Sequence, residues 1–482
     1  MRVFEQLEPK SVFRFFEDLT QIPRPSYDTR AVSDYCVRFA QARGIRYHQD
    51  RLNNVVLYAP ATAGYEHAPT VILQGHLDMV AVADPDSAVD PAHEPLIVRT
   101  DGQFVWAEGT SLGGDDGIAV AMALALLDDP SIPHPALEVV FTVDEEVGMD
   151  GARGLDPALL SGRLLLNVDS EDEGILTVSC AGGATATAEF ALETAPASGV
   201  CRTLEVSGLL GGHSGAEIHK GRANASILLG RALSQLADAL PVRLVSLAGG
   251  TKDNAITNAS CASIVLPEEC AEQAAQIVET CAKAFAAEYA VSDPNVRLTL
   301  REEELPADAL TQDDTRRVVR YLTLVPNGIA AMSMDIPGLV QTSCNLGVAR
   351  LEGDAFRATT SVRSSVASQK QMLLQKLRTL AELLGGTLTV AGDYPAWEYV
   401  RNSPLQSRMT RIWKELTGQD MRVEAIHAGL ECGLFSGKLP GLDAVSFGPD
   451  MADIHTAKER LSVPSVQRLW AYLLAVLADF AG

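Results

Sequence analysis

Two adjacent glutamates, Glu145 and Glu146, follow an apolar run over residues 137–143. The run predicts a buried strand, because it is short, apolar and rich in valine. Successive side chains on a strand point to opposite faces, so the two carboxylates can share a task only if the chain bends between them. One of them could bind a cation while the other handles protons. An acidic loop at the end of a strand would explain the same residues, and the choice depends on the rest of the chain.

A second candidate pair, His76 and Asp78, ends another predicted strand. The His-x-Asp spacing places both side chains on one face of that strand. Imidazole binds Zn²⁺ well and is commonly oriented by a carboxylate that accepts its other N–H, which Asp78 could do. A histidine at a strand end is also often only structural, so this pair alone decides nothing.

Three further residues extend the set, namely Asp115, Asp169 and His455. Asp115 begins a predicted helix, where it could equally be a helix cap. Together with His76 and Glu146, these residues form a group of nitrogen and oxygen ligands able to hold two divalent cations that share one carboxylate. Asp115 is the candidate for the shared carboxylate.

Two neighbouring cations polarise a carbonyl group and lower the pKa of the water between them. Such a site then needs one carboxylate that is not a ligand and can act as the base. Glu145, next to the candidate ligand Glu146, meets that requirement.

An α/β domain has to position these residues. Helical spacing at residues 9–20 and 30–44 and a buried helix at 113–128 alternate with strands predicted at 54–58, 70–74, 137–143 and 164–168. In such sheets, functional residues collect at the ends of strands, as the candidates do here. The chain returns to this style at about residue 392, so the domain is discontinuous: it comprises residues 1–183 and 392–482.

Residues 184–391 predict an inserted α+β domain made of two βαββαβ-like units. The first unit, 184–305, has the order strand, helix, two strands, helix, strand, and the second, 306–391, repeats this order without its first strand. Such units bury one helical face against one sheet, and two of them can pair edge to edge.

The composition narrows the class of protein. The net charge of −23 over 482 residues argues against nucleic acid or an anionic membrane as partner, since both need clustered Lys and Arg. The eight cysteines contain no Cys-x-x-Cys pair, which favours reduced thiols over a disulfide framework or a zinc ribbon. No segment has the pattern of a signal peptide or is long enough to span a bilayer, so we expect a cytoplasmic protein.

Four motifs resemble those of the dinuclear zinc exopeptidase and aminoacylase family, which includes glutamate carboxypeptidase and carnosinase. They are GHLDMV (75–80), LGGDDG (112–117), DEEVGMDG (144–151) and NVDS (167–170). Three others are similar to the aminoacyl-histidine dipeptidases of bacteria, namely IHAGLECGLF (426–435), NGI (327–329) and TSCNLG (342–347). The resemblance covers nearly the whole chain and its spacings agree. One departure is Asp116, where those dipeptidases more often have Asn.

The resemblance implies a three-layer α/β/α catalytic domain with an inserted lid domain and two divalent metal ions. It assigns His76 and Asp169 to one metal, Glu146 and His455 to the other, Asp115 to the bridge, Glu145 to the general base, and Asp78 to the orientation of His76. Asp144 receives no role.

In the insertion, the resemblance implies three roles: His213 hydrogen-bonds the developing oxyanion, Asn254 binds substrate, and Arg363 takes the substrate carboxylate. Arginine suits that task because its planar fork can donate two hydrogen bonds to a carboxylate. In shorter relatives one lid unit carries all three residues and the histidine comes from a neighbouring subunit. Here the two units divide them, which predicts lid closure within one chain, so that a possible homodimer is not required for catalysis.

The expected function is a metal-dependent dipeptidase that hydrolyses unblocked dipeptides with a metal-bridging water activated by Glu145. By resemblance, the substrates are of Xaa-His type, carnosine-like ones included. The ligand types admit Zn²⁺, Co²⁺ or Mn²⁺.

Three other functions agree with parts of the sequence. The alternative is an N-acyl amino acid deacylase on the same metal centre, which a pocket without carboxylate recognition by Arg363 would favour. A nucleotide hydrolase is disfavoured because GLFSGKL (433–439) is one residue short of a phosphate-binding loop and ends in Leu. A non-catalytic binding module is disfavoured by the complete ligand set and by Glu145.

Overall fold

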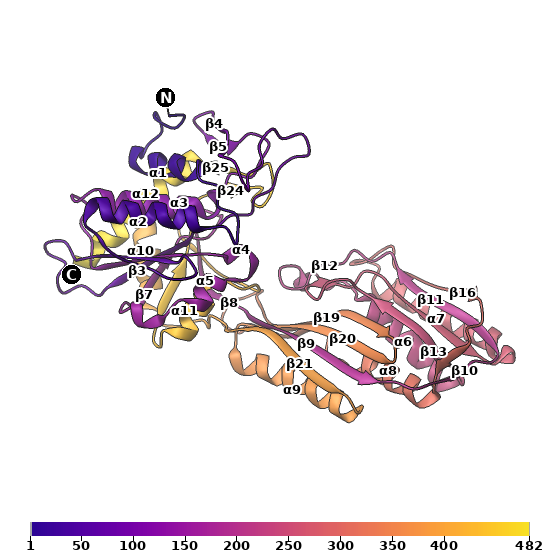
Figure 1. The fold of residues 1–482 in the computed structure, drawn as a ribbon. Coiled ribbons are helices and arrows are strands. Elements are labelled where there is room, and N and C mark those ends of the chain that lie inside the picture. Colours follow the sequence, from indigo (N-terminus) through magenta and orange to yellow (C-terminus); the bar gives the residue numbers. More distant parts are fainter. Residues whose placement is uncertain (1, 482) are drawn as a thin grey trace. The chain divides into compact units, whose positions relative to one another are not determined.

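The computed structural model describes residues 2–481, which form two compact units (Figure 1). The α/β unit comprises Met1–Ser179, Tyr399–Ala425 and Leu430–Gly482, and the inserted unit comprises Cys180–Glu398 with Ile426–Gly429. The predicted insertion, 184–391, lies within the long segment of the inserted unit. The sequence did not predict that Ile426–Gly429 would join it. Residues 1 and 482, the outer ends of the predicted α/β domain, lie outside the described part.

The α/β unit is built on an eight-stranded mixed sheet. Its order is β1 (Arg46–Gln49), β2 (Val55–Ala59), β6 (Leu137–Thr142), β3 (Val71–His76), β7 (Leu164–Asn167), β23 (Asp443–Ser446), β8 (Ile175–Cys180) and β22 (Arg422–Ile426). The central strands are parallel, because β3 pairs in parallel with both β6 and β7, and β7 with β23. The carboxyl ends of β3 and β7 therefore meet at one edge of the sheet.

The helices of this unit are α1 (Lys10–Thr20), α2 (Arg30–Arg43), α3 (Gly114–Asp128), α4 (Glu145–Gly148), α5 (Asp150–Gly154), α10 (Pro404–Thr417), α11 (Glu431–Lys438) and α12 (Val463–Ala478). As its sequence predicts, α3 is a buried helix, with every residue from Gly114 to Leu126 buried. It packs so closely on β3 that a Cβ atom at Gly75 would collide with Asp116 and with the side chain of Ala119. A smaller sheet has the order β24 (Met451–Ala452), β25 (Arg460–Ser462), β5 (Phe104–Ala107) and β4 (Val98–Thr100). The predicted mixed α/β class is confirmed.

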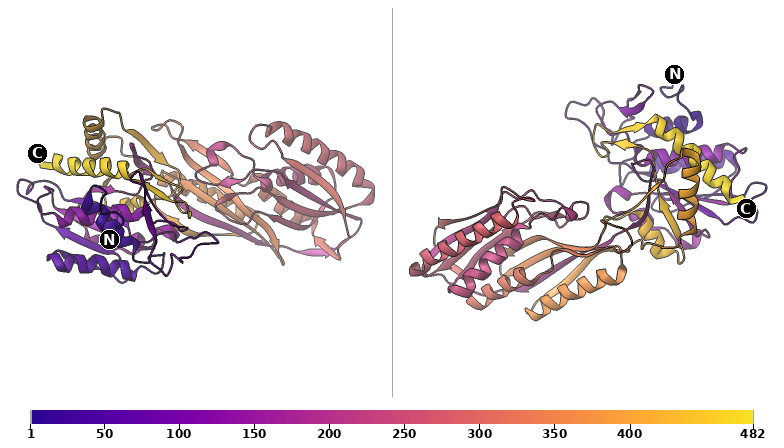
Figure 2. Two further views of the ribbon diagram at one scale, coloured as in Figure 1. Left: turned by 90° about the horizontal axis from the view of Figure 1, so that it is seen from above. Right: turned by 180° about the vertical axis from the view of Figure 1, so that it is seen from behind.

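The inserted unit contains one nine-stranded sheet (Figure 2). Its main path is β16 (Arg297–Glu303), β11 (Val200–Ser207), β15 (Ser260–Leu266), β13 (Arg243–Gly249), β19 (Val340–Glu352), β20 (Ala355–Ser364), β9 (Gly182–Ala191) and β21 (Thr387–Tyr394), with β18 (Gly328–Met332) beside β19. One hydrophobic core joins this sheet to α6 (Ala225–Ala239), α7 (Ala271–Glu288), α8 (Gln312–Leu324) and α9 (Ala367–Leu383).

The two halves of this unit are nested. The outer half contains β9, α8, β19, β20, α9 and β21; the nested half contains β11, α6, β13, β15, α7 and β16. In each half the first strand of the chain lies between the third and the fourth in the sheet: β9 lies between β20 and β21, and β11 lies between β15 and β16. The two halves join where β13 pairs with β19. Where the chain leaves the outer half and returns to it, β10 (Thr194–Pro196) pairs with β17 (Asp308–Leu310).

This nesting corrects the prediction of consecutive units at 184–305 and 306–391, the second without its first strand. The missing strand is β9, which precedes the whole nested half and pairs with β20 and β21. Its partners lie far away in the sequence, and the local pattern of a strand does not indicate which strand it will pair with.

Candidate functional site

His76, at the carboxyl end of β3, is the centre of a cluster of carboxylates. Its side chain is 1% exposed. Its Nε2 atom lies 3.0 Å from Asp115 Oδ1 and 3.6 Å from Asp169 Oδ1. On the other side of the ring, Nδ1 lies 3.2 Å from the carbonyl oxygen of Asp78 and 3.4 Å from its Oδ1. Asp78 is thus placed to hold the orientation of the ring.

Asp115 joins the two imidazoles of the cluster. One carboxylate oxygen faces His76, and the other, Oδ2, lies 3.1 Å from Nε2 of His455. The same His455 nitrogen lies 3.0 Å from Glu146 Oε2. The structure therefore brings together all five residues that the sequence proposed as metal ligands, and Asp115 offers one oxygen to each side.

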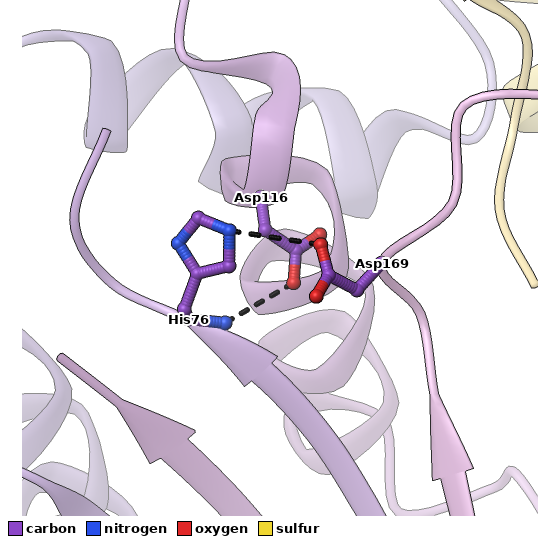
Figure 3. A group of neighbouring side chains, drawn as sticks. All are labelled: His76, Asp116 and Asp169. Atoms are coloured by element: carbon purple, nitrogen blue, oxygen red, sulfur yellow. Dashed lines mark hydrogen bonds and ion pairs between the residues drawn. The ribbon is translucent and has the colours of Figure 1, made fainter. Parts of the chain in front are cut away.

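The elements explain this convergence. His76 ends β3 and Asp169 follows β7, at the edge where parallel strands place their carboxyl ends. Asp116, beside Asp115 at the start of α3, also reaches the cluster and accepts a hydrogen bond of 3.1 Å from the backbone N–H of His76 (Figure 3). From the sequence, Asp116 was recognised only as a departure from the family pattern, and no role was predicted for it.

The chain turns after β6, which provides the bend that the two glutamates need to act at one site. Asp144 has a left-handed backbone with φ of 58°, and Glu145 and Glu146 begin the short helix α4. Both glutamates donate their backbone N–H to the carboxylate of Asp78, at 3.2 and 3.3 Å. Asp144 in turn accepts a hydrogen bond from the backbone of Tyr27 at 2.6 Å. The turn places Glu145 and Glu146 side by side on the cluster.

The pKa values of this cluster show that its side chains favour bound protons or other cations. Burial opposes a proton on His76, but hydrogen bonds to its three carboxylate neighbours raise its pKa well above the usual value. Hydrogen bonds to Asp115 and Glu146 raise the pKa of His455 to about 10. Burial, with Asp169 nearby, raises the pKa of Glu145 well above its usual value. The cluster therefore binds protons strongly, and a cation with nitrogen and oxygen ligands could take their place.

Two observations test whether the residues fit metal ions. Ligand atoms of His76, Asp116 and Asp169 lie within 4.8 Å of one another, as do those of His76, Asp115 and Glu146. Glu146 Oε1 and Asp116 Oδ1 are buried without a hydrogen-bond partner among residues 2–481. Buried carboxylate oxygens without a partner are costly, and a bound cation would satisfy them.

The inserted unit gathers a second cluster. His213 lies in β12 (Gly212–His213), which pairs with β14 (Ala255–Ile256), and the backbone N–H of Ser214 donates to the carbonyl oxygen of Asn254 at 2.8 Å. The Nδ1 atom of His213 accepts hydrogen bonds from the backbone N–H groups of Gly215 and Ala216 at 3.2 and 3.0 Å. Burial and the positive charge of Arg363 lower the pKa of His213, so its ring is neutral at pH 7. Because Nδ1 accepts these two hydrogen bonds, the proton of the neutral ring lies on Nε2.

Arg363, from β20 of the outer half, completes this cluster. A Cβ atom placed on Gly215 would lie 3.1 Å from Cε1 of His213 and 3.2 Å from Nε of Arg363. Asn345 of β19 holds the turn around Asn254, because its amide donates to the carbonyl oxygens on either side, at 2.8 and 3.2 Å. The nested arrangement thus brings His213 of the nested half close to Arg363 of the outer half, and the backbone of Asn254 lies beside the His213 segment.

Comparison with known proteins identifies the family. Residues 72–479 match the model of Peptidase family M20/M25/M40. The chain belongs to this peptidase family. It is 36% identical over 481 residues to the cytosol non-specific dipeptidase of Escherichia coli K12, with 99% of each chain covered. The resemblance predicted from the motifs, and with it the hydrolase class, is confirmed.

Solved structures of related peptidases have the same fold. The aminoacylhistidine dipeptidase of Vibrio alginolyticus superposes on this M20 peptidase with a TM-score of 0.94 and 35% identity, covering 99% of this chain and 98% of that one. An aminopeptidase of Bacillus cereus has a TM-score of 0.57 at 14% identity, with coverage of 99% and 100%, and is similar in fold alone. Along residues 2–481, no helix combines the length and apolar character needed to cross a membrane.

Two buried charged residues that were not predicted from the sequence, Arg24 and Glu459, hold the loops around His76 and Asp115 in this M20 peptidase. The guanidinium of Arg24 donates to the carbonyl oxygens of Leu77 and Asp78, at 2.7 and 2.8 Å, and to that of Gly113. The carboxylate of Glu459 accepts hydrogen bonds from four successive backbone N–H groups, those of residues 112–115, at 2.7, 3.0, 2.8 and 3.4 Å.

Part of this arrangement had a signal in the sequence. The exposed N–H groups at the start of a helix attract a carboxylate, and two glycines precede Asp115 there. No local pattern identifies Glu459, near the other end of the chain, as the residue that supplies it.

Proposed function

We propose that this M20 peptidase is a metal-dependent dipeptidase that hydrolyses unblocked dipeptides. The observation that carries the proposal is the carboxylate of Asp115, which presents one oxygen to His76 at 3.0 Å and the other to His455 at 3.1 Å. A carboxylate shared in this way suits two neighbouring cations. The two relatives similar over the full length, one a non-specific dipeptidase and one an aminoacylhistidine dipeptidase, support the substrate class.

Two divalent cations are part of the proposal. His76 and Asp169 would hold one of them, Glu146 and His455 the other, and Asp115 both. When bound, such a pair polarises the peptide carbonyl and lowers the pKa of water. Imidazole and carboxylate ligands suit Zn²⁺, Co²⁺ and Mn²⁺.

Glu145 moves the proton in this proposal. Its carboxylate accepts a proton from the attacking water and returns it to the nitrogen of the leaving amine. Asp78 assists in two ways: it faces Nδ1 of His76, and its carboxylate holds the backbone of Glu145 at 3.2 Å. Asp78 is therefore a positioning residue for both.

The inserted unit supplies substrate recognition in this proposal. Arg363 binds the C-terminal carboxylate of the dipeptide, Asn254 binds the same end, and Nε2–H of His213 donates to the developing oxyanion. In this proposal the three residues act within one chain, and the approach of His213 to Arg363 inside the inserted unit supports that arrangement. The proposal also places the enzyme in the cytosol, as the name of the Escherichia coli relative supports.

A matrix of substrates tests the function. The purified protein, loaded with Zn²⁺, Co²⁺ or Mn²⁺, is assayed on unblocked dipeptides with and without C-terminal histidine, on tripeptides and on N-acetyl amino acids. We expect chelator-sensitive cleavage of dipeptides, including Xaa-His. Faster cleavage of N-acetyl amino acids would favour the deacylase alternative, and failure on every dipeptide in every metal form would overturn the proposal.

A further inference from the structure

A second histidine, His427, belongs to the cluster of the inserted unit. Its segment, Ile426–Gly429, is fixed there because the backbone N–H of Ala181 lies 3.2 Å from the carbonyl oxygen of Ile426 and 3.0 Å from that of Ala428. The side chain is 8% exposed, and its Nε2 atom lies 2.7 Å from the hydroxyl of Ser343 in β19. No role was assigned to this residue from the sequence.

The backbone of Gly215 shows how closely His427 approaches the other members of the cluster. A Cβ atom placed on Gly215 would lie 2.6 Å from the carbonyl oxygen of His427, and at similar range from His213 and Arg363. Burial lowers the pKa of His427 to about 4, and the positive charge of Arg363 adds to this. The ring is therefore neutral at pH 7, and only one of its nitrogens carries a proton.

Two nitrogen atoms of this cluster are buried without a hydrogen-bond partner among the described residues, Nδ1 of His427 and Nε of Arg363. His427 is the only partner found for the Ser343 hydroxyl within residues 2–481, so that hydroxyl satisfies both groups by donating to Nε2. The proton of the neutral ring then lies on Nδ1. His427 and Arg363 thus each offer an N–H donor that has no acceptor, and one of them is on a cation.

We propose that His427 is a substrate-binding residue, whose Nδ1–H donates to the C-terminal carboxylate of the dipeptide together with Arg363. The inference rests on the proposed function and deepens it, because it assigns a second donor to the substrate carboxylate. A carboxylate has acceptor positions for both N–H groups, and bonds to charged groups are the strong ones.

Two replacements of His427 distinguish the roles of its two ring nitrogens. Asparagine keeps a polar group near the position of Nδ1, whereas glutamine keeps one near Nε2, facing Ser343. Wild type, His427→Asn and His427→Gln are compared on one dipeptide and on its C-terminal amide, in the metal-loaded enzyme. We expect His427→Gln to raise KM for the free acid by about 10- to 100-fold, the loss of one bond to a charged group. We expect little change on the amide, and partial recovery in His427→Asn.

His134 is the matched control, because it is also 8% exposed and lies in the α/β unit. His134→Gln should leave the ratio of acid to amide kcat/KM as in wild type. The inference is overturned if His427→Gln, with normal metal content, keeps the wild-type ratio, or if His427→Asn recovers nothing. A wild-type protein without dipeptidase activity would instead overturn the proposed function.

A structure of the wild-type enzyme with a non-hydrolysable dipeptide analogue decides the point independently of any variant. A carboxylate oxygen within hydrogen-bond distance of Nδ1 of His427 supports the inference. A carboxylate bound by Arg363 alone, with a water or a protein group on Nδ1, overturns it.

Discussion

The two clusters of this protein differ in the kind of buried polar atom that they leave without a partner. In the His76 cluster these atoms include carboxylate oxygens, Glu146 Oε1 and Asp116 Oδ1. The loops around that cluster are held by Arg24, which bonds three carbonyl oxygens, and by Glu459, which bonds four backbone N–H groups. In the inserted unit the atoms without a partner among the described residues include two nitrogens, Nδ1 of His427 and Nε of Arg363. The difference teaches that acceptors left without a partner suit a cation, whereas donors left without one suit an anionic ligand such as a carboxylate.

The largest effect should come from the proton carrier at the metal centre. Glu145→Gln removes the proposed base and leaves the proposed metal ligands, so we expect kcat to fall by about 10²- to 10⁴-fold, the usual contribution of general base catalysis. Metal content, measured by mass spectrometry, should stay at the wild-type value. Glu146→Ala, in contrast, should lose metal as well as activity, and equal metal content in the two variants would contradict the division of their roles.

Arg363 tests the other side of the comparison. Arg363→Ala removes a charged donor to the substrate carboxylate, so KM for dipeptides should rise by about 100-fold while metal content is unchanged. Steady-state kinetics on several dipeptides measure this. A fall in kcat with KM unchanged would mean that Arg363 acts on the transition state and not on the bound carboxylate.

The support of the metal centre can be weakened without touching a ligand. Glu459→Gln replaces the carboxylate that accepts the N–H groups before Asp115, and we expect metal affinity to fall by about 10- to 100-fold, as is typical for residues behind a ligand. Titration of the apoprotein with a competing chelator measures this. Glu173→Gln, which alters an ion pair with Arg468 elsewhere in the α/β unit, is the control and should bind metal as wild type does.

The last prediction needs no substitution and concerns pH. In the metal-free protein the pKa of His455 is raised to about 10 and that of His76 is also raised, so both rings hold protons at pH 7. Metal ligands must be deprotonated, so binding releases these protons, and affinity rises with pH between about 6 and 9, by up to about tenfold per unit for each proton displaced. Calorimetry in buffers of different ionisation enthalpy measures the release. A metal affinity that is flat over this range would contradict the raised pKa values.

Much of the local structure could be predicted from the sequence. The helices predicted at residues 9–20 and 113–128 are found as α1 and α3, and the strand predicted at residues 70–74 as β3. Each has a clear apolar pattern that is local in the chain. The turn after β6 was less evident, because a left-handed residue at Asp144 leaves no strong signal.

The sequence by itself determined the types of ligand, the order of helices and strands, and the family, since these depend on residue chemistry and local spacing. Only the tertiary structure decided that β9 completes the outer half, that Glu459 holds the loop of Asp115, and that His427 joins Arg363. Each of these contacts joins segments far apart in the chain. Their free energy arises from burial and hydrogen bonds that form only on folding, so no local pattern records them.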